Sequence, residues 1–154
     1  RLIQEFAFCM NIYYLTYFVG AIFILFFAPA ILHYIGSTVI LPSFTVLLIY
    51  AIVVFLEGNH SFFSTLIVTK NDVPFVIPSL ISGFFISVGC YLSLRYTTYG
   101  ILGLILVQGF VQLSYSNWKW PLYILKDFKI SPYQFVAEGV WEFKRNLKKK
   151  LYAN

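Results

Sequence analysis

The sequence predicts an all-α integral membrane protein, a helical bundle with about four transmembrane helices and a C-terminal amphipathic basic helix. Sixty per cent of its 154 residues are hydrophobic and only 11% are charged, whereas a soluble domain has roughly 45–50% apolar and 25% charged residues. No Asp, Glu, Lys or Arg occurs in the 51 residues between Glu5 and Glu57. Because a membrane-spanning helix needs only about 20 residues, this stretch holds two spans.

The expected spans cover about residues 6–32, 43–69, 74–94 and 99–118. The reversal between the first two is expected at Gly36-Ser37-Thr38, with Pro29, His33 and Pro42 around it, since Gly and Pro interrupt helices and His is costly in lipid. The last two occupy uncharged runs that are each about one bilayer long. We therefore expect a transmembrane region over 1–121 and a cytoplasmic tail over 122–154.

The net charge of +5 arises entirely after residue 118, because three basic and three acidic residues cancel before that point. An excess of Lys and Arg marks the cytoplasmic side of a membrane protein. Both ends of this segment are therefore expected in the cytoplasm. A basic tail beside a span favours anionic lipid of the inner leaflet as its partner. The sequence contains no soluble module with stacking aromatic residues, so it does not predict binding to nucleic acid.

The tail contains the pattern of an amphipathic helix. Ser131 and Pro132 are suited to the N-cap and the first turn. An apolar stripe then recurs at helical spacing, at Val136, Val140, Phe143, Leu147 and Leu151. Basic residues accompany it at Lys144, Arg145, Lys148, Lys149 and Lys150. The pattern predicts a helix lying on the inner leaflet; a solvated, frayed tail is the alternative.

Trp118, Lys119 and Trp120 stand where the fourth span is expected to leave the hydrocarbon. Indole rings and a lysine that extends toward water both favour the level of the lipid headgroups. We therefore expect these three residues to anchor the chain at the interface.

Glu57 is the one acidic residue well inside an expected span, and His60 and Ser64 follow it on the same helix face. A charge near the bilayer centre costs roughly 2.5–3.5 kcal/mol, so Glu57 should face protein or water. Gln108 and Gln112 form a similar row in the fourth span. These five residues are candidates for the lining of a transport cavity. A packing role between helices explains them equally well.

Other small and polar residues have plainer interpretations. Ser79, Gly83 and Ser87 recur every four residues in the third span, and such a strip lets another helix approach closely. Cys9 and Cys90 are interpreted as small buried hydrophobic residues. The sequence contains no phosphate-binding Gly-rich loop, no His-Glu-x-x-His pair and no spaced set of metal ligands. It therefore predicts no catalytic residues, no metal and no cofactor, and not an enzyme.

From residue 55 to 121 the chain resembles the oligosaccharide flippases of polysaccharide and O-antigen biosynthesis, within the MATE/MOP superfamily. The likeness is carried by residues 60–65 at the end of the second span, the inner turn 69–74, the outer turn 99–103 and Gln108. Thr69 stands where the family often has Gly. The resemblance implies a transporter of the bacterial inner membrane that moves lipid-linked oligosaccharides by alternating access, as in lipopolysaccharide assembly.

These flippases have twelve or more spans, so we expect the chain to be a C-terminal fragment that works with remaining N-terminal helices of the same protein. A first residue that is Arg rather than Met favours the same interpretation. Two alternatives remain open: a multidrug or metabolite exporter of the same superfamily, and a small four-span scaffold protein. A membrane-embedded transferase would need acidic clusters in its inner turns, and Asp72 alone does not provide one.

Overall fold

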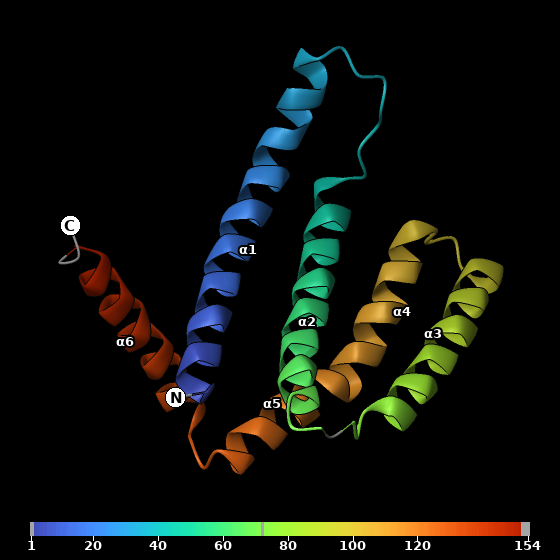
Figure 1. Ribbon diagram of the computed structural model, residues 1–154. Coiled ribbons are helices and arrows are strands. Elements are labelled where there is room, and N and C mark those ends of the chain that lie inside the picture. Colours follow the sequence, from blue (N-terminus) through green and yellow to red (C-terminus); the bar gives the residue numbers. More distant parts are fainter. Residues whose placement is uncertain (1, 72, 152–154) are drawn as a thin grey trace. The chain divides into compact units, whose positions relative to one another are not determined.

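The computed structural model describes residues 2–71 and 73–151, without the side chains of residues 147 and 149–151. Within this part, every regular element is an α-helix, which confirms the all-α prediction. The six helices are α1 (Leu2–Tyr34), α2 (Phe44–Val68), α3 (Val76–Tyr96), α4 (Ile101–Ser114), α5 (Ser116–Asp127) and α6 (Pro132–Leu151), coloured in chain order in Figure 1.

Three helices of the described part, α1, α2 and α3, are long and apolar enough to cross a membrane. Their bounds lie within four residues of the expected spans. The turn after α1 also forms where it was expected. The amides of Gly36 and Ser37 donate to the carbonyls of His33 and Leu32, and Gly36 has a φ of 67°. This is a Schellman motif, in which glycine accepts the left-handed conformation at little steric cost.

The expected fourth span is divided into α4 and α5, which meet at Tyr115. Two polar side chains cap the interrupted end. Ser114 Oγ donates to the carbonyl of Val111 at 2.7 Å, and Asn117 Nδ2 donates to the carbonyl of Gln112 at 3.3 Å. Such side-chain bonds compete with the helical ladder. The prediction of one continuous helix over 99–118 was therefore wrong, and α5 continues through the expected tail boundary to Asp127.

The chain forms two compact units. The terminal unit comprises residues 1–20 and 122–154, and the central unit comprises residues 21–121. The limit inside α1 was not anticipated from the sequence.

In the central unit, α4 packs against both α2 and α3. Glycines permit the close approach. Gly109 of α4 faces Val53 of α2, and Gly103 of α4 faces Ser93 of α3. The strip that the sequence offered for packing, Ser79, Gly83 and Ser87, is exposed in the described structure. A side chain at Gly83 would meet nothing within 4 Å.

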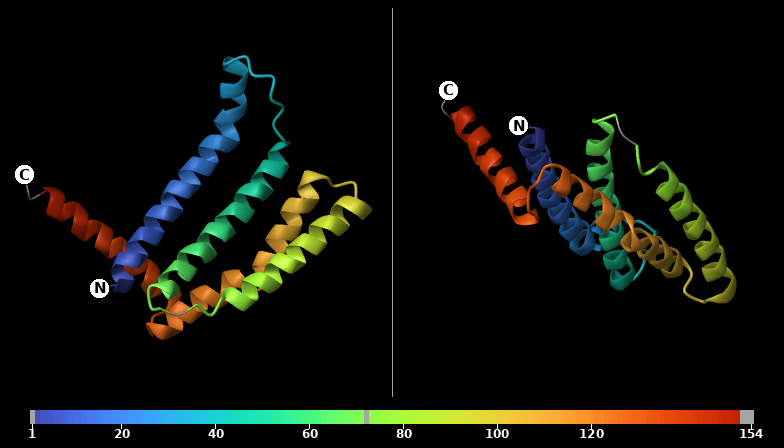
Figure 2. Two further views of the ribbon diagram at one scale, coloured as in Figure 1. Left: turned by 45° about the vertical axis from the view of Figure 1, so that its right-hand side comes forward. Right: turned by 90° about the horizontal axis from the view of Figure 1, so that it is seen from below.

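In the terminal unit, α6 lies beside the N-terminal end of α1, as both views of Figure 2 show. Its start follows the expected pattern. The backbone N–H of Gln134 donates to Ser131 Oγ at 3.2 Å, and the backbone N–H of Ser131 donates to Gln134 Oε1 at 2.9 Å. This reciprocal pair is a capping box, with Gln134 in the position that Glu or Gln usually takes.

Candidate functional site between α2 and α4

Two of the predicted polar residues meet across the α2–α4 contact. Gln108 Nε2 donates a hydrogen bond to Glu57 Oε2 at 3.1 Å. Glu57 is the fourteenth of the 25 residues of α2, and Gln108 is the eighth of the 14 residues of α4. The bond therefore joins the middle of one helix to the middle of the other. Glu57 is otherwise exposed on the surface of the central unit.

His60 and Ser64 continue along α2 from Glu57 at successive turns, and both are half-buried. The His60 Nδ1 atom is enclosed by protein and makes no hydrogen bond of ordinary geometry within the described part of the chain. Together with Glu57 and Gln108, these residues give one side of the α2–α4 pair a carboxylate, an amide, an imidazole and a hydroxyl.

Gln112 lies one turn beyond Gln108 but is buried, with 8% of its surface exposed. Its Oε1 atom and the Oδ1 atom of Asn117 are both enclosed without a hydrogen-bond partner among the described residues. Gln112 therefore belongs to a second polar cluster, at the junction of α4 and α5, rather than to the Glu57 surface. The role of Asn117 was not anticipated from the sequence, because a continuous helix was expected there.

An apolar groove of about 820 Å³ lies between α3 and α4. Pro78, Phe85 and Gly89 of α3 and Val107, Phe110 and Ser114 of α4 are among the residues that line it. Its walls contain no ionisable side chain except the phenol of Tyr115. The groove is thus chemically distinct from the polar contact around Glu57.

The three expected interface anchors do not behave alike. Trp118 and Lys119 are exposed, as an anchor requires. Trp120 is only 3% exposed. Its ring makes edge contacts with Phe75 and Tyr115, with centroids 5.8 and 6.0 Å apart. The prediction was wrong for Trp120, because α5 directs its indole into the protein interior.

The expected lipid-surface basic residues lie on α6. Lys144 and Lys148 are exposed, whereas Arg145 donates to Glu142 Oε1 at 2.5 Å and stacks over the Trp141 ring at 4.9 Å. The side chains of Lys149 and Lys150 lie outside the described part of the structure.

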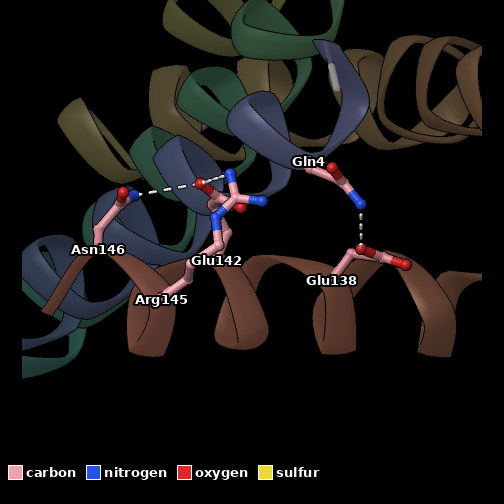
Figure 3. A network of polar contacts seen from close by, with 5 residues as sticks. All are labelled: Gln4, Glu138, Glu142, Arg145 and Asn146. Carbon is pink, nitrogen blue, oxygen red and sulfur yellow. Dashed lines mark hydrogen bonds and ion pairs between the residues drawn. The ribbon is translucent and has the colours of Figure 1, made fainter. Parts of the chain in front are cut away.

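A polar network in the terminal unit was not anticipated from the sequence (Figure 3). Gln4 Nε2 of α1 donates to Glu138 Oε2 of α6 at 2.9 Å. Glu142 is 3% exposed, and its Oε1 atom also accepts from Asn146 Nδ2 at 3.3 Å. The sequence feature that could have indicated this network is the four-residue spacing of Glu138 and Glu142, which places both acids on one side of α6.

Three apolar helices of spanning length define the class of this chain as a multi-pass membrane protein. Comparison with known protein families, with curated protein sequences and with solved structures finds no match. Within the described residues, no three His, Cys, Asp or Glu side chains cluster closely enough to hold a metal ion.

Proposed function

We propose that this chain is part of a flippase that carries lipid-linked oligosaccharide precursors across the bacterial inner membrane by alternating access. The observation that carries the proposal is the hydrogen bond from Gln108 to Glu57 between the middles of α2 and α4. The choice of substrate rests on the sequence resemblance to oligosaccharide flippases.

A carboxylate near the middle of a span is costly in hydrocarbon, so Glu57 must adjoin water or further protein. Gln108 uses one amide hydrogen on Glu57 Oε2. The remaining lone pairs of a carboxylate can accept bonds from other donors, including the hydroxyls of a sugar. The surface formed by Glu57, His60 and Gln108 is therefore suited to one wall of a polar passage.

Further helices of the same protein would complete the passage, because the described chain supplies one polar wall and not an enclosed path. Within its predicted spans the sequence contains no Lys or Arg. The pyrophosphate of a lipid-linked sugar is bound best by such cations. In this proposal those cations come from the remaining helices, and both ends of the segment lie in the cytoplasm.

The test is Glu57→Gln in the full-length protein as its gene encodes it. The amide keeps the size of the side chain but removes its charge, so oligosaccharide export should fall to background while the amount of membrane-inserted protein is unchanged. The readouts are surface polysaccharide and lipid-linked precursor retained on the inner face. Glu5→Gln is the matched control, because it makes the same chemical change at the first turn of α1.

Normal export by Glu57→Gln would assign Glu57 to helix packing and remove the support for a polar passage. Export of small cationic compounds, with no effect on lipid-linked precursor, would instead identify the exporter alternative.

A further inference from the structure

The terminal helix α6 has two faces with different partners. One face packs on α1 through Phe135, Gly139 and Glu142, each of which is buried. The Phe135 ring lies 5.9 Å from the ring of Phe6. A Cβ atom at Gly139 would collide with the Ala7 carbonyl, so only glycine permits this approach of the two helices. This face is fully occupied by protein.

The neighbouring face of α6 is apolar and about half exposed, with the Phe143 ring 6.2 Å from the ring of Phe8 of α1. Val136, Val140 and Phe143 are 45–48% exposed, and Tyr133 is 83% exposed. These side chains recur at helical spacing along one stripe. A groove of about 310 Å³ runs along this face, and its lining includes Tyr133, Val136, Val140, Trp141 and Lys144.

The acidic residues and the exposed lysines of α6 lie on different faces of the helix. Glu138 is held by Gln4, and Glu142 is held by Arg145 and Asn146. Lys144 and Lys148 are exposed. The acids therefore lie toward α1, where Gln4 donates a hydrogen bond to Glu138 and Arg145 forms an ion pair with Glu142, and the exposed surface beside the apolar stripe is positive. Such a surface complements the phosphates of anionic lipids.

The length of α1 places this surface near the edge of a bilayer. At 1.5 Å per residue, its 33 residues extend about 50 Å, while a hydrocarbon core is about 30 Å thick. The residues of α1 that hold α6 lie in its first three turns and include the polar Gln4 and Asn11. This end of α1 can therefore reach the headgroup layer, and α6 with it.

We propose that α6 lies in the headgroup layer of an anionic bilayer, with the stripe of Val136, Val140 and Phe143 inserted between lipids and with Lys144 and Lys148 at the phosphates. Arg145 is committed to Glu142 and contributes little to lipid binding. The proposal concerns the membrane attachment of this chain and does not depend on what the protein transports.

The experiment places a nitroxide at Val140→Cys in the full chain, with Cys9 and Cys90 changed to Ser, reconstituted in vesicles. Oxygen concentrates in the bilayer, whereas a charged nickel complex stays in water. In vesicles containing phosphatidylglycerol, the ratio of oxygen to nickel collisions at residue 140 should be several-fold higher than at the control position, Lys126→Cys, an exposed position of α5 to which the proposal gives no role in lipid binding. Changing both Lys144 and Lys148 to Gln should lower the ratio at residue 140, because each lysine contributes about 1 kcal/mol at an anionic surface, or roughly a fivefold change in binding.

Two outcomes would overturn the proposal. Equal nickel access at positions 140 and 126 in anionic vesicles would mean that α6 is solvated. A nitroxide at position 140 that neither oxygen nor nickel reaches would mean that another protein segment covers the stripe. Both labelled positions are exposed, so neither nitroxide disturbs the contact with α1.

Discussion

Gln108 Nε2 of α4 lies 3.1 Å from Glu57 Oε2 of α2, and each residue stands at the middle of its helix. This bond is a polar link in a helix pair that also packs closely where Gly109 meets Val53. An amide that donates to a carboxylate across two helices occupies one of its acceptor positions and favours one register of the pair.

We expect Glu57 and Gln108 to be energetically coupled. In a double-mutant cycle, the sum of the stability losses caused by Glu57→Ala and by Gln108→Ala should exceed the loss in the double variant by about 0.5–1.5 kcal/mol. Thermal unfolding of the purified chain in detergent measures each value. Strictly additive losses would mean that the bond contributes nothing to the α2–α4 contact.

The close approach of α2 and α4 depends on Gly109. A Cβ atom there would lie 2.7 Å from Val53 Cγ2, so Gly109→Ala should destabilise the protein by about 1–3 kcal/mol through overpacking. Adding Val53→Ala removes the opposing methyl groups and should restore part of the loss. The measurement is again thermal unfolding of the chain in detergent.

Gly83→Ala is the matched control for that comparison, because a Cβ atom at Gly83 meets nothing within 4 Å. Its effect should be small or slightly stabilising, as alanine favours helix more than glycine does. If Gly83→Ala lost as much stability as Gly109→Ala, both effects would have to come from the helix backbone and not from the contact with Val53.

Trp120 should matter far more for folding than Trp118. Trp120 is 3% exposed and contacts two aromatic rings, whereas Trp118 is 62% exposed. Replacement of a buried Trp by Ala typically costs about 3–5 kcal/mol, so Trp120→Ala should lower the midpoint of thermal unfolding markedly. Trp118→Ala should leave stability within about 0.5 kcal/mol of the parent. Similar losses for both variants would contradict the burial of Trp120.

The capping box at Ser131 should hold the first turn of α6. Ser131→Ala removes the acceptor for the Gln134 amide and should cost about 1 kcal/mol locally. Amide hydrogen exchange in the first turn of α6 should then accelerate by roughly fivefold. Ser131→Asp keeps an acceptor and should exchange like the parent, whereas acceleration in both variants would show that a side-chain acceptor at residue 131 is not enough to hold the turn.

Several features of the fold could be predicted directly from the residues. The uncharged runs locate α1, α2 and α3, because a helix surrounded by lipid needs apolar side chains along its whole length. The turn at Gly36 and the start of α6 at Ser131 follow from the local chemistry of glycine and of a capping hydroxyl. Glu57 and Gln108 were recognised as unusual from their polarity alone.

The side-chain contacts between helices could not be predicted in the same way. In a spanning helix every face is apolar, so hydrophobic periodicity does not identify the packed side. The strip around Gly83, expected to pack, is exposed in the described structure, and the close contact forms at Gly109, which the sequence did not single out. The burial of Trp120 against Phe75 and the docking of α6 on α1 depend on residues distant in sequence. The sequence by itself determined which segments are helical and apolar. Only the tertiary structure decided which side chains meet, because those contacts depend on the fit between helix surfaces.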